Sequence, residues 1–151
     1  VISEERMQVL HSVLRYEENR KVLLFCDNIS ALHTLSSIVK DCIGPISMKT
    51  ADSVRSECID KFSRASSCVM LCSKVFDTGV DLPDAETIVQ ISMLTGSRMQ
   101  EGQRIGRIGR LSKRPKRSYT IITTTSELEK RRHRDEYLRH LGYDVYDVSV
   151  L

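Results

Sequence analysis

Proline and glycine are scarce in this chain: its 151 residues include three prolines and seven glycines, with 40% hydrophobic and 28% charged residues. This composition excludes a disordered or fibrous chain and is typical of a globular one. No apolar run approaches the roughly 18 to 20 residues that a membrane span requires, and the opening residues, VISEER, do not form a signal peptide. We therefore expect a soluble intracellular protein in which residues 1–151 form one domain.

Several common catalytic and binding patterns are also absent. The chain has no Gly-x-x-x-x-Gly-Lys-Ser/Thr loop, and residues 27–30, which follow the first predicted strand, are not the glycine-rich turn of a dinucleotide-binding domain. No paired carboxylates, Ser-His-Asp set or Cys-His set stands out by spacing. The four histidines all fall in predicted helices, as surface or packing residues. Any ATP chemistry must therefore be completed by residues of another domain.

Cysteine is present, but its pattern favours neither disulfides nor a metal site. The five cysteines are odd in number, and three lie in or beside apolar runs, where a free thiol packs as a small hydrophobe. The one close pair, Cys68 and Cys72, shares one face if its stretch is a strand, without the turn that a zinc knuckle uses. We predict reduced cysteines and no bound metal.

The apolar residues fall into segments that alternate between helical and strand-like patterns. Helices are predicted over 1–18, 31–39, 54–62, 97–108 and 126–140. Buried strands are predicted over 21–26, 46–48, 69–72, 86–91 and 118–122, and a final alternating strand over 143–150. Near-continuous apolar strands that alternate with helices predict a three-layer α/β/α domain with a mostly parallel central sheet.

Polar residues and glycine indicate where these helices begin and end. Asp27 and Asn28 can cap the second predicted helix, and Asp52 with Ser53 can cap the third. Gly142 suits the C-cap of the last helix. The chain shows no internal repeat and no flexible linker, in keeping with one domain.

Positive charge is concentrated in one stretch. The formal net charge is only +3, yet residues 98–117 include eight basic residues and a single acidic residue, Glu101. The basic residues are Arg98, Arg104, Arg107, Arg110, Lys113, Arg114, Lys116 and Arg117. Like charges repel one another unless an anion is close, which makes phosphate a natural partner, although a solvated surface is the alternative explanation.

The most informative run within this stretch is QRIGRIGR, residues 103–110. On a helix, Gln103, Arg107 and Arg110 share one face, since their spacings match the helical repeat. On such a helix, the two guanidiniums of Arg107 and Arg110 would project from the same face. A planar, permanently charged guanidinium can stabilise the negative charge that is spread over a γ-phosphate during its transfer, which is the role of an arginine finger. The simpler alternative is an amphipathic helix with ordinary surface arginines.

Residues 103–110 resemble motif VI of the superfamily-two helicases, and residues 73–83, SKVFDTGVDLP, resemble motif V, in the same order. Together with residues 90–92 (QIS), 96–104 (GSRMQEGQR) and 141–143 (LGY), they resemble the XPB family over nearly the whole chain. The resemblance implies a RecA-like helicase C-terminal lobe. It implies the second motor lobe of an ATP-dependent DNA helicase or translocase, moving 3′ to 5′, in transcription initiation and nucleotide excision repair.

The same resemblance implies a set of nucleotide contacts. Gly79 and Asp81 match the motif V positions that approach the nucleotide, with Asp81 placed to accept from the ribose hydroxyls. Gln103, Arg107 and Arg110 match the motif VI positions that sense and stabilise the γ-phosphate. The implied cofactor is ATP with Mg²⁺, which a first RecA-like lobe would hold for the most part. The chain alone would then be inactive.

The resemblance implies nucleic-acid contacts as well. Ser73 matches the hydroxyl residue that contacts the nucleic-acid backbone, and Asn28 and Arg55 lie where related lobes touch phosphates. Such contacts bind DNA without reading its sequence. Ser73 could instead cap a strand end, and Asn28 could instead cap a helix. The other implied partners are the first lobe and the TFIIH or repair-factor subunits, in the nucleus.

Departures from the family pattern keep other interpretations open. The family usually has Thr-Ser-Gln where this chain has TAD, residues 50–52, so a carboxylate lies near the expected DNA track unless it caps the helix. Gly79 and Gly109 also replace residues common in the family and move the motifs toward the general helicase pattern, which leaves a divergent paralogue as an alternative. A non-catalytic helicase-like lobe that serves as a docking platform is the second hypothesis. An unrelated α/β nucleotide-binding domain is the third.

Overall fold

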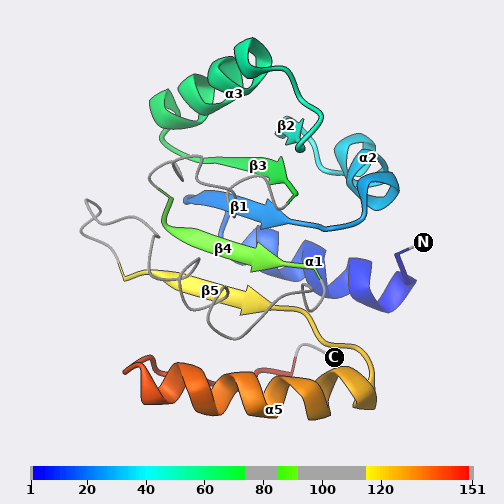
Figure 1. Cartoon of the computed structure of the whole chain (residues 1–151), viewed down its shortest axis with the longest axis vertical. Helices are drawn as coiled ribbons and strands as arrows, with labels where there is room; N and C mark the ends of the chain where they lie inside the picture. Colours follow the sequence, from blue (N-terminus) through cyan, green and yellow to red (C-terminus); the bar gives the residue numbers. More distant parts are fainter. Residues whose placement is uncertain (1, 74–84, 92–114, 150–151) are drawn as a thin grey trace.

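The computed structural model of the chain describes residues 2–73, 85–91 and 115–149. Over these residues, five short strands form one parallel sheet in the order β2-β3-β1-β4-β5. The strands are β1 (Lys21–Phe25), β2 (Ile43–Ile46), β3 (Cys68–Cys72), β4 (Thr87–Gln90) and β5 (Arg117–Thr120). The helices are α1 (Glu4–Tyr16), α2 (Ile29–Ile38), α3 (Asp52–Arg64) and α5 (Thr125–His140). Figure 1 shows them around the sheet, which confirms the predicted α/β fold class.

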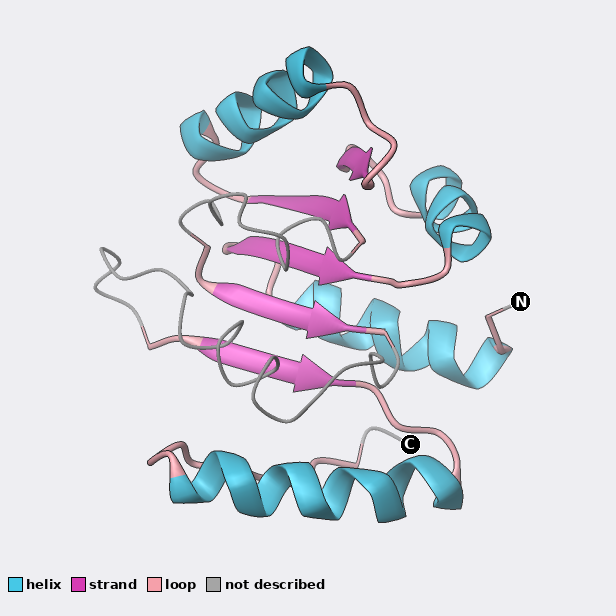
Figure 2. Ribbon diagram, in the orientation of Figure 1, coloured by secondary structure: helices cyan, strands magenta, loops and turns pink. Residues whose placement is uncertain are grey.

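Both faces of the sheet are buried, because successive residues of its central strand enter different cores. Val22 and Leu24 of β1 pack in one cluster with residues of α1 and α2, while Leu23 and Phe25 pack in a second cluster with Phe62 of α3. All five of these side chains are at most 1% exposed. Helices therefore cover the two faces (Figure 2), which gives the predicted three layers. None of the described helices is long and apolar enough to cross a membrane.

The last helix ends as its sequence predicts. Gly142 has φ of 96° and donates its N–H to the carbonyl of Arg139 at 3.0 Å, and Tyr143 donates to Leu138 at 3.1 Å. These two bonds form a Schellman motif, in which glycine takes the left-handed conformation at little cost. The position of Gly142 at this helix end is confirmed.

The strand predicted over 46–48 lies three residues earlier, at Ile43–Ile46, and Met48 is 57% exposed. The pair Gly44-Pro45 lies within β2, which is an edge strand, where proline is tolerated because one side of the strand makes no ladder bonds. Gly44 has φ of 95°, and an added Cβ would lie 2.7 Å from the carbonyl oxygen of Leu71. Glycine therefore lets β2 approach β3.

The final strand predicted over 143–150 is wrong for the described residues 143–149, which form no strand. Tyr146 and Val148 are 78% and 77% exposed, so their alternation does not correspond to one buried face. The segment instead runs back along the preceding helix, where Arg139 Nη2 donates to the Val145 carbonyl at 3.2 Å. Alternation predicts a strand only where a sheet edge accepts it.

The five cysteines are free thiols. Cys26 and Cys72 are buried, and burial raises the pKa of the Cys26 thiol. Cys68 and Cys72 lie in the same strand and pack in the same core cluster, as their spacing predicts. Within the described ranges, no three histidine, cysteine, aspartate or glutamate side chains are grouped as a metal site would need. The cysteines therefore serve the core.

A buried carboxylate ties the first helix to the amino ends of two strands. Glu17 is 1% exposed, and its carboxylate accepts from Arg117 at 3.0 Å, from Thr87 at 3.2 Å and from the Tyr119 hydroxyl at 2.5 Å. Arg20 lies 3.4 Å from the same carboxylate. We call these five residues the Glu17 cluster. Burial and the hydrogen bond to Glu17 raise the pKa of Tyr119 to about 12.

Arg20 extends this cluster to the backbone. Its Nη1 donates to the carbonyls of Pro115 at 2.7 Å and Glu86 at 3.4 Å, which lie just before β5 and β4 respectively. An arginine can serve several acceptors in one plane, because its guanidinium carries five N–H groups in a fixed fork. Arg20 therefore fastens the amino ends of these two neighbouring strands to each other.

Candidate functional site

All strands of a parallel sheet end at one edge, which we call the carboxyl edge. In open α/β sheets, ligands bind outside this edge. Three predicted nucleic-acid-binding residues follow strands that neighbour one another in the order β2-β3-β1. Arg55 lies in the first turn of α3, after β2; Ser73 follows β3; and Asn28 follows β1. The fold therefore brings these three residues, which are far apart in sequence, to the same edge.

Asn28 performs the capping role that its position after β1 allows. Its side-chain oxygen accepts from the N–H of Ala31 at 3.0 Å, and its backbone is extended, as an N-cap requires. The cap occupies Oδ1 and not the amide NH₂ group. Asn28 is exposed, so this NH₂ group remains a donor at the carboxyl edge.

Ser73 continues the hydrogen bonding of β3 beyond the strand. Its N–H donates to the Ile46 carbonyl at 2.9 Å, and the N–H of Cys26 donates to Cys72 at 3.0 Å. Ser73 is only 6% exposed. Its backbone thus joins the ends of β2 and β3, and its hydroxyl has little exposed surface in this arrangement.

A tight turn between β2 and α3 adds a cation to the carboxyl edge. Ser47 and Thr50 bond reciprocally, with the N–H of Ser47 donating to Thr50 Oγ1 at 2.9 Å and the N–H of Thr50 donating to the Ser47 carbonyl at 3.1 Å. Lys49 lies in this turn and is exposed. No motif singles out Lys49 in the sequence; only the strand order brings its turn to the same edge of the sheet as Asn28 and Ser73.

The expectation that Asp52 caps α3 is wrong. The N-cap is Ala51, which has no side-chain oxygen, and Asp52 is the first helical residue. Its carboxylate lies 3.3 Å from Arg55 Nη1, while Arg55 Nη2 donates to the Thr50 carbonyl at 3.2 Å. Asp52 still benefits from the helix N-terminus, because an acid anywhere in the first turn interacts favourably with the dipole. Its 96% exposed carboxylate also offsets part of the positive charge of Arg55.

Arg55 itself is held in place rather than free to move. Its side chain is 17% exposed, and its Nε is buried without a hydrogen-bond partner. Because this Nε has essentially no exposed surface, only the two Nη groups of Arg55 are open to a phosphate. These groups already bond to Asp52 and to the Thr50 carbonyl, and the Asp52 carboxylate opposes a phosphate electrostatically.

The predicted nucleotide contacts lie outside the described residues. These are Gly79 and Asp81 of the motif V-like run and Gln103, Arg107 and Arg110 of the motif VI-like run, with the helix expected over 97–108. What is described is where their segments leave the sheet: residues 74–84 follow Ser73 at the end of β3, and residues 92–114 follow Ile91 at the end of β4. Both segments begin at the carboxyl edge.

Two members of the predicted basic stretch are described. Arg117 belongs to the Glu17 cluster, where it pairs with a buried carboxylate, and its guanidinium lies 5.3 Å from the ring centre of Tyr16. Lys116 has a buried ammonium without a hydrogen-bond partner. Arg117 thus has a partner within the fold and does not require an outside anion. The phosphate interpretation remains a prediction for the residues from 98 to 114.

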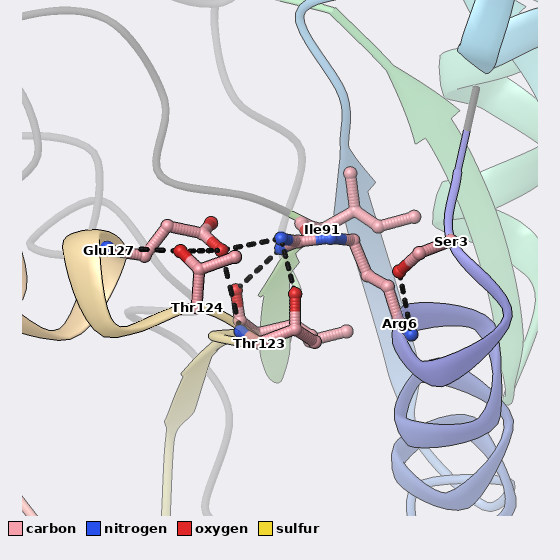
Figure 3. A network of polar contacts seen from close by, with 7 residues as sticks. Ser3, Arg6, Ile91, Thr123, Thr124 and Glu127 are labelled. Carbon is pink, nitrogen blue, oxygen red and sulfur yellow. Dashed lines mark hydrogen bonds and ion pairs between the residues drawn. The ribbon is translucent and has the colours of Figure 1, made fainter.

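Among the described residues, an arginine of α1 makes the densest set of polar contacts at the carboxyl edge (Figure 3). Arg6 Nη1 donates to the carbonyls of Ile91 at 2.8 Å and Ile121 at 2.9 Å, the residues that directly follow β4 and β5. Its Nη2 donates to Thr123 Oγ1 at 2.7 Å and to Glu127 Oε1 at 2.6 Å. We call these five residues the Arg6 network. Its members are up to 121 positions apart, so the sequence carried no local signal for it.

Glu127 links the Arg6 network to the start of α5. Burial opposes its ionisation, but the hydrogen bond and positive charge of Arg6 outweigh burial, and the pKa of Glu127 lies below its usual value. Glu127 also donates its backbone N–H to Thr124 Oγ1, the N-cap of α5, at 3.1 Å. The network therefore joins α1, β4, β5 and α5 around one ionised carboxylate.

Comparison with known proteins places this arrangement in a family. Residues 1–150 match the family described as ERCC3/RAD25/XPB C-terminal helicase. The chain is 34% identical to the general transcription and DNA repair factor IIH helicase/translocase subunit XPB of Drosophila melanogaster, covering 100% of this chain and 20% of the relative. It is 32% identical to the XPB subunit of Antonospora locustae, covering 100% and 23%. The chain therefore spans about a fifth of the length of these curated relatives.

Solved structures show the same fold at lower identity. The C-terminal domain of the DEAD-box protein Dbp5 matches with a TM-score of 0.77 and 17% identity, over 90% of this chain and 79% of that one. A DEAD-box protein from Methanococcus jannaschii matches with a TM-score of 0.73 and 23% identity, over 89% of this chain and 37% of that one. These likenesses confirm the predicted RecA-like helicase C-terminal fold.

Proposed function

Since the chain belongs to the ERCC3/RAD25/XPB C-terminal helicase family, we propose that it is the second motor lobe of an ATP-dependent DNA helicase or translocase. Its curated relatives are named as helicase/translocase subunits of a transcription and DNA repair factor. We propose the same setting here, with other subunits of that factor as partners and the nucleus as the site of action. The observation that carries the proposal is the gathering of Asn28, Ser73 and Arg55 at the carboxyl edge.

The nucleotide part of the proposal divides the work between two lobes. ATP with Mg²⁺ would lie between this lobe and a first lobe that supplies the phosphate loop and most metal ligands. This lobe would supply Gly79, Asp81, Gln103, Arg107 and Arg110, whose segments both leave the sheet at the carboxyl edge. Arginines suit a transferring phosphoryl group because catalysis there depends on positioning and on charge stabilisation.

The experiment that tests this function compares the 151-residue chain with a longer protein that also carries the first lobe. The longer protein is expected to hydrolyse ATP faster when DNA is added, and the chain alone is expected to show no turnover, because it lacks a phosphate loop. Turnover by the purified chain would refute the two-lobe division. A longer protein that binds its partner subunits but shows no DNA-stimulated turnover would favour the docking platform.

DNA binding by the chain is expected to be weak, independent of sequence and steeply salt-dependent. Contacts to phosphates release counterions, so the logarithm of the binding constant falls with the logarithm of salt by about 0.9 per phosphate neutralised. Lys49→Gln is expected to reduce this slope by about one, because Lys49 is an exposed cation at the carboxyl edge. Fluorescence anisotropy with two unrelated duplexes over a salt series measures both quantities.

A matched control for Lys49 is available on α5. Lys130 is also exposed, but α5 lies beside β5, at the far end of the strand order from β2 (Figure 1). Lys130→Gln removes the same charge and is expected to leave the salt slope unchanged. Equal slopes for all three proteins would place the DNA elsewhere than the β2–β3–β1 part of the carboxyl edge.

A further inference from the structure

The Arg6 network is placed where the proposed chemistry would be sensitive to small movements. The carbonyls of Ile91 and Ile121 lie one residue beyond β4 and β5, and Arg6 Nη1 bonds to both. The corresponding N–H groups still belong to the ladder, since Ile91 donates to Phe25 and Ile121 donates to Gln90. Arg6 therefore continues, with a side chain, the bonding between strands that the backbone has just ended.

Ile91 is also the last described residue before 92–114, the segment that carries Gln103, Arg107 and Arg110. Arg6 bonds to the Ile91 carbonyl, and the segment that directly follows Ile91 carries the residues proposed to contact the γ-phosphate. A displacement of about 1 Å at reacting groups can cost ~10²-fold in rate, even when its origin is distant. If Ile91 moved at the end of β4, the displacement would pass along the chain to the residues that follow it.

The anchoring of α1 does not rest on Arg6 alone. Leu10 and Val13 of the same helix are buried in the core cluster against the sheet, at 0% and 8% exposure. Burying two apolar side chains contributes the non-directional part of helix docking. What Arg6 adds is directional, because its fork meets four acceptors on three different segments, Ile91, Ile121–Thr123 and Glu127.

From these observations we propose that Arg6 is a positioning residue for ATP hydrolysis, which fixes the carboxyl ends of β4 and β5 relative to each other. This inference rests on the proposed function. Arg6 touches neither nucleotide nor DNA in this role and acts through the backbone of Ile91. A lysine at position 6 keeps the charge and the ion pair with Glu127, but its single ammonium cannot span both carbonyls and both side chains.

The chain contains a matched control for this proposal. Arg20, which is buried where Arg6 is partly buried, also donates to two backbone carbonyls next to neighbouring strands, Glu86 and Pro115, but at the amino ends of β4 and β5. Arg20→Lys therefore removes the same fork from the same pair of strands at the opposite edge. A role in stability alone predicts that kcat falls in each variant in step with its loss of stability, whereas the positioning role predicts a loss of kcat in Arg6→Lys and not in Arg20→Lys.

The test uses the longer, DNA-stimulated protein and measures kcat, the KM for ATP and the thermal midpoint of each variant. Arg6→Lys is expected to lower kcat by at least tenfold with less than about a threefold change in KM, since ~10²-fold is the cost of a misplacement near 1 Å. Arg20→Lys is expected to lower the thermal midpoint at least as much and leave kcat within about twofold. Thr123→Val, which removes one of the four bonds and retains the side-chain shape, is expected to lower kcat by less.

The possible results distinguish failure of the positioning role of Arg6 from failure of the proposed ATPase function. If the parent shows no DNA-stimulated hydrolysis, the proposed function fails and the positioning role fails with it. If the parent is active and Arg6→Lys and Arg20→Lys lower kcat equally, or neither lowers it, only the positioning role is wrong. If Arg6→Lys does not fold, the milder Thr123→Val decides, because unchanged kcat in that variant also contradicts the proposal.

Discussion

Arg110→Lys, made in a protein that carries both lobes, is expected to reduce DNA-stimulated ATP hydrolysis by more than tenfold while ATP binding changes little. Lysine keeps the positive charge but loses the planar fork that spans the charge developing on the γ-phosphate. Arginine fingers contribute ~10³ to 10⁵ in rate, so even partial loss of the contact is large. Steady-state turnover and equilibrium binding of a labelled nucleotide measure the two effects separately.

Two further arginine-to-lysine substitutions in the same basic stretch provide a comparison for Arg110→Lys. Arg107→Lys is expected to behave like Arg110→Lys, because the spacing of residues 103, 107 and 110 predicts that they share one face of the helix expected over 97–108. Arg114→Lys, in the basic run KRPKR that leads into β5 in the sequence, is expected to leave turnover nearly unchanged. If all three variants hydrolyse ATP at the parental rate with DNA present, the motif VI-like run does not act on the phosphate, and the docking platform becomes the better hypothesis.

Glu17→Ala is expected to lower the free energy of unfolding of the chain by about 3–5 kcal/mol, the usual cost of removing one partner from a buried ion pair. The Glu17 side chain is fully buried, and that of Arg20 is 7% exposed, so the substitution leaves a buried guanidinium without its carboxylate. Urea unfolding followed by far-UV circular dichroism measures the change, since the chain has no tryptophan.

An exposed ion pair supplies the control for Glu17. Lys61 lies 3.9 Å from Glu57 on α3, and their side chains are 62% and 69% exposed. Lys61→Ala is expected to change the free energy of unfolding by no more than about 0.5 kcal/mol, because exposed pairs are well solvated and cost side-chain entropy to hold. A loss of less than about 1 kcal/mol in Glu17→Ala would show that water or other groups satisfy Arg20 readily.

Local sequence patterns predicted those features of the fold and of the site that depend only on neighbouring residues. Asn28 caps α2 and Gly142 ends α5 because each role requires only a short side chain or a positive φ next to a helix end. The same reasoning failed at Asp52, where Ala51 is the cap and the carboxylate pairs with Arg55. It also failed at residues 143–149, since alternation does not reveal whether a sheet edge is present to receive a strand.

The sequence by itself determined the fold class and the family, because both can be recognised from patterns of residues that are neighbours along the chain. These are the alternation of apolar strands with helices and the runs 73–83 and 103–110. Only the tertiary structure decided which distant residues meet. The sheet order β2-β3-β1-β4-β5 brings Arg55, Ser73 and Asn28 to one edge, and it brings Arg6 to the ends of β4 and β5. The physical reason is that strand order and crossovers, which set such contacts, leave no period in the sequence.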